Sequence, residues 1–337
     1  GRRADTGGRV EGLWLADAPG QGAGTMGGDA ASLRWRVMLR GKRLRPGVAV
    51  TLDQGLGGVE STVRLRLLER DTLEIGGGVW LAEVDGARPG ETTVALLERL
   101  GVTPLPPYIR AARRHAGEAE SAEGERTDRA EYQTVYAHAE PTGQGSSGSV
   151  AAPTAGLHFT PELLARLADL GVGRAEVTLH VGTGTFKPVE TEFVEQHPMH
   201  AEWCELPAGT CRAIGACRAA GGRVVAVGTT SARTLESFTP EQVAACARQG
   251  APGRPLATWT RLLITPGFAW RNVDALMTNF HLPGSTLLAM VASFAGGVER
   301  VKSIYAEAMA CGYRFYSYGD AMLVVARPSG EQARAIT

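Results

Sequence analysis

The sequence lacks the features that mark several protein classes at once. Lys and Arg together number 35, as do Asp and Glu, so the net charge is zero and the protein is not a globally basic binder of nucleic acid. The longest apolar stretch, residues 287–294, contains a serine and is far shorter than the ~18 residues of a membrane span. The five cysteines include no Cys-x-x-Cys pair, which argues against a zinc ribbon or a disulfide framework and favours a reducing, cytoplasmic setting.

Glycine and locally clustered charge are what the sequence does have. Glycine accounts for 44 of the 337 residues, nearly twice its usual share of about 7%. Residues 34–45 contain six basic residues and no acid, while residues 118–128 contain five acids and one base. The acidic stretch lacks apolar periodicity, so we expect a mobile loop there. The basic run alternates with apolar residues, which fits either a solvated hairpin or a phosphate-facing patch.

Two patterns of secondary structure divide the chain, whose length predicts about two domains. The first part has short segments that alternate apolar with polar residues, separated by glycine-rich turns, as in a small antiparallel barrel. Its predicted strands cover residues 9–15, 33–39, 62–68 and 79–84, and a helix covers 93–101.

The second part alternates strands with helices, which predicts an α/β (α+β) domain with a largely parallel or mixed sheet. We therefore expect a β-barrel domain at 1–108, a connector with the mobile acidic loop at 109–148, and an α/β catalytic domain at 149–337. The predicted strands of this part cover 176–181, 223–227, 261–264 and 321–326, and the helices cover 161–170, 232–238, 286–295 and 299–310.

Short blocks of Gly, Thr, Ser, His and Pro lie at the predicted strand ends, where α/β folds place their sites. In residues 149–160, Thr154 and His158 precede a helix start, which suits either anion binding or a capped connector with a packed histidine. In residues 227–233, a Gly-Thr-Thr-Ser turn opens a helix, which suits a carboxylate, a ribose or a phosphate, or is a plain N-cap. The other blocks cover residues 178–188, 197–202, 278–286 and 316–320.

A pair of histidines, His197 and His200, with Glu202 nearby, raises the possibility of a metal site. Pro198 breaks any helix through this segment, and no third ligand shows metal spacing. Structural histidines, substrate binding and acid–base work fit the same residues. We expect no metal, and a metal-dependent hydrolase remains an alternative that metal analysis of the purified protein would test.

Taken together, the blocks resemble the S-adenosylmethionine:tRNA ribosyltransferase-isomerase family of queuosine biosynthesis. The resemblance runs in family order from about Gly7 onward and includes GKRLRPG, PLPPYI and EYQTVYA in the first part. The main motifs are SVAAPTAGLHFT, TLHVGTGTFKPV, HPMHAEW, VVAVGTTSARTLES, DALMTNFHLPGSTLLAMVASFAG and YRFYSYGDAML.

The resemblance implies an unusual use of S-adenosylmethionine. Its ribosyl part is transferred to 7-aminomethyl-7-deazaguanine at the tRNA wobble position and rearranged, giving epoxyqueuosine with release of adenine and methionine. S-adenosylmethionine is then a co-substrate, and no cofactor is implied. The implied fold is an α/β domain with an inserted β-barrel. The family has a further segment before Gly7, so we expect the α/β domain to lack its N-terminal segment here, and we expect a cytoplasmic monomer with no membrane contact.

The implied chemistry needs a base at the ribose carbon that the sulfonium acidifies, and a hydrogen bond or a proton for the departing adenine. Which histidine performs which step stays open, and a non-catalytic tRNA-binding module remains a second alternative. We expect the proton steps to be shared by His158, His180, His200 and His281. The expected substrate-binding residues are Tyr132, Gln133, Thr154, Thr183, Thr185, His197, Glu202, Thr229, Thr230, Ser231, Arg233, Asn279, Tyr318 and Asp320.

Overall fold

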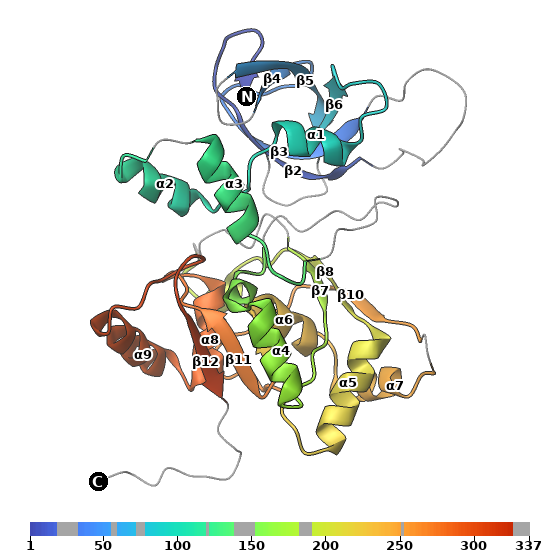
Figure 1. Cartoon of the computed structure of the whole chain (residues 1–337), viewed down its shortest axis with the longest axis vertical. Helices are drawn as coiled ribbons and strands as arrows, with labels where there is room; N and C mark the ends of the chain where they lie inside the picture. The colour runs from blue at the N-terminus through green and yellow to red at the C-terminus, as the bar shows by residue number, and fades with distance from the viewer. Residues whose placement is uncertain are drawn as a thin grey trace. The chain divides into compact units, whose positions relative to one another are not determined.

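The chain folds into two compact units, Gly1–Ala152 and Pro153–Thr337, each with its own hydrophobic core (Figure 1). The structure is a computed structural model. It describes residues 1–18, 33–54, 59–71, 78–118, 121–137, 152–181, 191–250 and 253–325.

The first unit is built on one antiparallel sheet of six strands in the order β1-β4-β5-β6-β3-β2. An isolated bridge joins Arg2 of one edge strand to Arg9, just before the other edge strand. All four strands predicted in this part are confirmed, whereas two short ones escaped prediction. The strands are β1 (Arg2–Arg3), β2 (Glu11–Asp17), β3 (Arg34–Arg40), β4 (Ala49–Gln54), β5 (Val59–Arg70) and β6 (Val79–Asp85).

The basic run at 34–45 is explained largely by strand β3. Trp35 and Val37 alternate into the core, while Arg36 points to Asp71 with 2.7 Å between Nε and Oδ2. The predicted helix is α1 (Thr93–Leu100), whose first turn is capped by Thr92. In β3, the alternation of apolar and basic residues is thus the pattern of a half-buried strand.

The acidic stretch at 118–128 is the place where the prediction of a loop was wrong. Helix α2 (Pro107–His115) is followed by α3 (Ala122–Glu131), capped by Ser121. The acids in the first turn of α3 complement the helix dipole. The guanidinium of Arg113 binds both carboxylate oxygens of buried Asp128 at 2.6 Å. Ion pairs rather than an apolar face stabilise this helix, which is why apolar periodicity did not reveal it.

The second unit contains two three-stranded sheets, and the predicted mixed α/β class is confirmed. One sheet has the order β10-β8-β7 and is antiparallel; the other has the order β12-β11-β9, with β9 and β11 parallel. The strand predicted at 261–264 was wrong, because the ladder with β8 uses the preceding residues and Ile264 is buried without belonging to a strand. The strands are β7 (Thr178–His180), β8 (Glu202–Leu206), β9 (Val225–Val227), β10 (Leu256–Thr260), β11 (Ala275–Asn279) and β12 (Ala321–Val325).

Helices cover these sheets, and α6 contacts strands of both. Thr160 and Ser285 cap α4 and α8 through their side chains, as their sequences predict. No helix in the described part of the chain is long and apolar enough to cross a membrane. The helical segments are η2 (Thr154–His158), α4 (Pro161–Asp169), η4 (Val194–Gln196), α5 (Ala208–Ala219), α6 (Thr229–Glu236), α7 (Pro240–Ala247), α8 (Thr286–Ala295) and α9 (Val298–Ala310).

Candidate active site

The candidate site lies at the carboxyl ends of the parallel strands β9 and β11. Val227 faces Met277 across the two strands, and the next backbone N–H, that of Gly228, donates to the Met277 carbonyl at 2.8 Å. Parallel strands end at the same edge of their sheet, which is where ligands bind in α/β folds. The blocks that follow the two strands are therefore brought together, although they are about fifty residues apart in sequence.

Asn279, at the end of β11, links two residues of the short helix η2. Its Oδ1 accepts a hydrogen bond from the Thr154 hydroxyl at 3.0 Å, and its Nδ2 lies 3.1 Å from Nε2 of His158. An amide nitrogen only donates, so in this arrangement Nε2 of His158 holds the lone pair and the neutral ring carries its proton on Nδ1. The Asn279 side chain is buried, which keeps its amide beside the imidazole.

Asp320 brings the C-terminal block to the same place. Its carboxylate accepts the backbone N–H of Arg314 at 2.7 Å. This hydrogen bond lowers the pKa of Asp320, and the positive charge of Arg314 lowers it further. Asp320 is therefore an ionised carboxylate near the His158 ring at neutral pH.

His281 follows β11 and is held at both its backbone and its ring. Its backbone N–H donates to the Tyr305 hydroxyl at 2.9 Å, and its Nε2 lies 2.8 Å from the Thr278 hydroxyl. Burial lowers the pKa of His281 from 6.5 to about 4. The ring is therefore neutral near pH 7 and acts there as a hydrogen-bonding group rather than as a cation.

Arg233 of α6 and Glu202 of β8 form a buried ion pair. Nη1 of the arginine lies 2.5 Å from Oε2 of the glutamate, and the two side chains are 6% and 3% exposed. Nε of the same guanidinium is buried and has no hydrogen-bond partner among the described residues. An unsatisfied donor on a buried cation is costly, so this group is suited to meeting an acceptor on a substrate.

The first turn of α6, the helix that carries Arg233, adds backbone donors to the site. Gly228 precedes it with a φ of +90°, a conformation that favours glycine, and no side chain caps the helix. A Cβ at Gly228 would lie 3.8 Å from that of Ala155 in η2, so the turn and η2 are neighbours. The N–H groups of this turn, at Thr229, Thr230 and Ser231, point along the helix toward its positive end.

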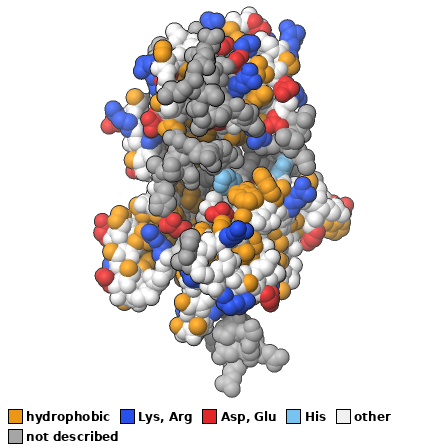
Figure 2. All heavy atoms as spheres, turned by 90° about the vertical axis from the view of Figure 1, so that its right-hand side faces the viewer, with side chains coloured by type: hydrophobic (Ala, Val, Ile, Leu, Met, Phe, Trp, Pro, Cys, Tyr) orange, Lys and Arg blue, Asp and Glu red, His pale blue; other side chains and the backbone are white. Residues whose placement is uncertain are grey.

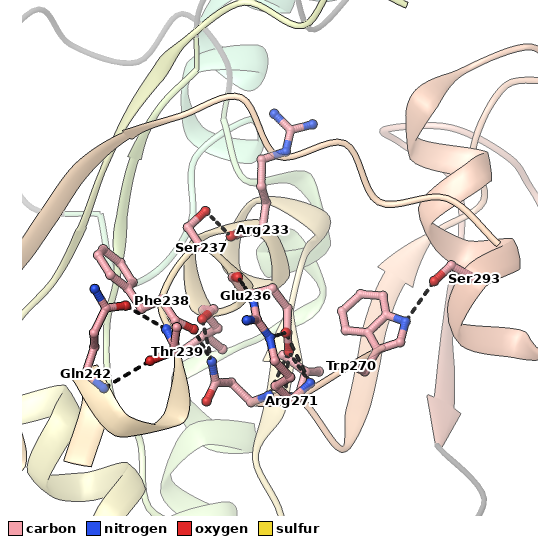
Figure 3. Close-up of polar contacts among 12 residues, drawn as sticks. Arg233, Glu236, Ser237, Phe238, Thr239, Gln242, Trp270, Arg271 and Ser293 are labelled. Carbon is pink, nitrogen blue, oxygen red and sulfur yellow. Dashed lines mark hydrogen bonds and ion pairs between the residues drawn. The ribbon is translucent and has the colours of Figure 1, made fainter. Parts of the chain in front are cut away.

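The other end of α6 fixes the segment that leads into β11 (Figure 3). The fully buried carboxylate of Glu236 accepts the backbone N–H groups of Arg271, Asn272 and Val273 at distances of 2.8 to 3.2 Å. The Asn272 amide donates to the carbonyls of Leu235 and Phe238, both at 2.8 Å. Sequence reasoning missed both residues; the only signal was an acid one turn after Ala232 on the buried face of α6.

The other predicted residues lie at several places in the fold. His180 ends β7 opposite Trp203, and His197 and His200 precede β8; no hydrogen bond among the described residues connects them to His158 or His281. Tyr132 and Gln133 lie in the first unit at the end of α3. Tyr318 lies in the turn before Asp320, and Thr183 and Thr185 lie outside the described residues.

The metal alternative finds no support in the part of the chain that the structure describes. No group of three or more His, Cys, Asp or Glu residues there could hold a metal ion. The carboxylate of Glu202, the third member of the suspected set, is engaged by Arg233 instead.

Comparison with known proteins places the chain in a family. The model of the family described as "Queuosine biosynthesis protein" matches residues 1–324, so the chain belongs to the queuosine biosynthesis protein family, and the resemblance noted in the sequence is confirmed.

Relatives within the family carry a more particular name, S-adenosylmethionine:tRNA ribosyltransferase-isomerase. The protein of that name from Phenylobacterium zucineum is 48% identical over 297 residues, which are 86% of this chain and 73% of that protein. The one from Pelotomaculum thermopropionicum is 41% identical over 326 residues, 96% of this chain and 80% of that protein. A solved S-adenosylmethionine tRNA ribosyltransferase from Thermotoga maritima is 28% identical, with a TM-score of 0.41, over 96% of this chain and 77% of that chain.

Proposed function

We propose that the protein is an S-adenosylmethionine:tRNA ribosyltransferase-isomerase, a transferase of queuosine biosynthesis. It transfers and isomerises the ribosyl part of S-adenosylmethionine onto 7-aminomethyl-7-deazaguanine at the tRNA wobble position and releases adenine and methionine. The observation that carries this proposal is the family match over residues 1–324, supported by relatives of that name at 41% to 48% identity.

We infer that His158 is the proton-handling residue of the site. The Thr154 hydroxyl can both donate and accept, so the Asn279 amide can turn over and pair equally well with a neutral or a protonated ring. Asp320 places a carboxylate near this ring. This combination suits a group that takes a proton in one step and gives one to the leaving adenine in another.

His281 has a different role in this proposal. Because burial holds its pKa at about 4, it orients or accepts a hydrogen bond from the substrate as a neutral ring. His180 and His200 stay proposed participants on the tRNA side, where the 7-aminomethyl group must lose a proton before it can attack. We propose Asn279, Tyr318 and Asp320 as contacts to the base or the ribose.

Arg233 and the first turn of α6 are the proposed anchor for the methionine end of S-adenosylmethionine. Its carboxylate would satisfy the Nε of Arg233, which has no hydrogen-bond partner among the described residues, and the N–H groups of the helix that no described side chain caps. Glu202 holds the guanidinium in place from β8.

The finer architecture is part of the same proposal. We propose that the curved sheet of the first unit is a β-barrel inserted into the α/β domain, with boundaries at 1–108, 109–148 and 149–337. The protein would work as a cytoplasmic monomer without a cofactor or a metal.

Adenine release is the test of this function. We expect S-adenosylmethionine and tRNA carrying 7-aminomethyl-7-deazaguanine to yield adenine, measured by liquid chromatography, only when both are present. His158→Ala should lower the rate by about a hundredfold or more. His281→Ala should also lower it, by removing a substrate contact, while His115→Ala, at an exposed position of α2, should not. A protein that binds both substrates without releasing adenine would refute the function, and full activity of both site variants would refute the roles assigned to these histidines.

A further inference from the structure

Three aromatic rings form a row across the outer face of the sheet β10-β8-β7. Trp259 faces Trp203 in the antiparallel register, and Trp203 faces His180 on its other side. Residues that face each other across neighbouring strands project from the same face of a sheet. The two tryptophan rings are 5.8 Å apart between centroids at an angle of 64°. In Figure 2, hydrophobic side chains gather beside histidines on the side of the second unit that carries this sheet.

Packing within the unit does not account for this row. The alternate residues of β8, Glu202, Cys204 and Leu206, are the ones that turn into the core. Trp259 instead leaves 65% of its surface exposed, unusual for so large an apolar side chain. With respect to the described residues, Trp259 is therefore open to a partner, and Trp203 and His180 are partly exposed.

The row lies close to the candidate site. Trp203 is adjacent in the chain to Glu202, whose side chain points to the opposite face of β8 and binds Arg233. The ring row and Glu202 lie on opposite faces of a single sheet. A molecule on the ring row is therefore separated from the ion pair of the site only by the backbone of that sheet.

The charges around the row indicate what kind of partner fits. Arg261, two residues after Trp259, is exposed, and a guanidinium there can meet a phosphate. The next row of the same face carries Glu205 between Ala257 and Thr178, a carboxylate that can accept from the exocyclic amino group of a base. Flat aromatic rings with a nearby cation bind unpaired nucleobases by stacking, with little demand on sequence.

We propose that the row of Trp259, Trp203 and His180 is a stacking platform for unpaired bases of the tRNA anticodon loop, next to the base that is modified. The proposal rests on the proposed function for the identity of the RNA, but the platform itself is defined by the rings. It assigns a surface role to a sheet whose inner face belongs to the core.

Binding of a fluorescently labelled RNA hairpin with an anticodon loop, followed by anisotropy, tests the platform. We expect Trp259→Ala and Trp203→Ala each to weaken binding by about tenfold, and Trp259→Phe, which keeps a ring, to weaken it much less. Leu323→Ala removes a side chain that is 61% exposed on β12 of the other sheet and should leave binding unchanged. Because Trp259 is exposed, its variants should keep the wild-type melting temperature, so the test does not depend on Trp203→Ala folding.

The outcomes separate the platform from the proposed function. Ring-dependent hairpin binding without adenine release would support the platform and refute the function. Adenine release with an unchanged KM for tRNA in Trp259→Ala and Trp259→Phe, together with unchanged hairpin binding, would support the function and overturn the platform. Light scattering tests the alternative that the row binds a second copy of the chain. Self-association that is lost in Trp259→Ala while RNA affinity is unchanged would assign the row to that second copy and overturn the proposal.

Discussion

Replacing the buried Glu236 should destabilise the second unit more than replacing an exposed glutamate. In Glu236→Ala, the backbone N–H groups of Asn272 and Val273 lose their acceptor, and both residues are 4% exposed. An unsatisfied buried N–H costs about 1–3 kcal/mol, so the two together cost about 2–6 kcal/mol. The N–H of Arg271 belongs to an exposed residue and can turn to water.

The variant Glu236→Gln separates the contributions of the two carboxylate oxygens. Glu236→Gln keeps one carbonyl oxygen for Asn272 and Val273 but presents an NH2 group where the second carboxylate oxygen met Arg271. We expect a loss of about 1–2 kcal/mol, since a net hydrogen bond to a charged group contributes about 1.5–3 kcal/mol and part of it remains. Glu299→Gln, at a side chain that is 85% exposed, is the matched control and should change the free energy of unfolding by less than about 0.5 kcal/mol.

Urea denaturation followed by circular dichroism and tryptophan fluorescence measures these differences. Trp270, which donates to Ser293 at 2.8 Å and directly precedes Arg271, reports on the segment that the carboxylate fixes. The expected order of losses is Glu236→Ala, then Glu236→Gln, then Glu299→Gln. A loss in Glu236→Ala no larger than that of Glu299→Gln would show that these N–H groups find other acceptors, and the reasoning would be refuted.

Two further changes test other parts of the site. Glu202→Gln leaves the guanidinium of Arg233 buried without a counter-charge and should lower the free energy of unfolding by about 3–5 kcal/mol, measured by urea denaturation; a wild-type midpoint would contradict this. Because burial lowers the pKa of His281 from 6.5 to about 4, the unfolded chain binds the extra proton between these values, so stability should fall as the pH drops through that window and be fully present above it. His281→Gln should reduce the change in the urea unfolding midpoint between pH 7 and pH 5, and His115→Gln should keep it. An equal change in the two variants would contradict the lowered pKa of His281.

The sequence predicts much of the fold because alternation and caps are local signals. The strand around Trp35 alternates inward and outward residues, and the Thr160 and Ser285 caps mark helix starts correctly. What failed depends on partners far along the chain. Helix α3 depends on Arg113 reaching Asp128, and β10 is defined by its register with β8 rather than by its own apolar content.

In the candidate site too, residues marked by local patterns could be predicted, and a residue that depends on distant partners could not. Thr154, His158, Asn279 and His281 stand in polar blocks at strand ends, so their types and positions pointed to a site before any contact was known. Their catalytic and binding roles remain predictions. Glu236 could not be found in this way, because the N–H groups it binds belong to residues about thirty-five positions away.

The way in which the first unit joins the edges of its sheet has a consequence for solubility. A strand edge with unpaired N–H and C=O groups recruits other chains and promotes aggregation. Here the amino group of Gly1 donates to the Val10 carbonyl at 3.0 Å, the Val10 N–H donates to the Gly1 carbonyl at 2.8 Å, and the Arg3 N–H donates to the Gly8 carbonyl at 2.8 Å. In the described part of this unit, β1 and the residues just before β2 thus occupy some of each other's hydrogen-bonding groups, which leaves fewer of them open to a foreign strand at this corner of the sheet.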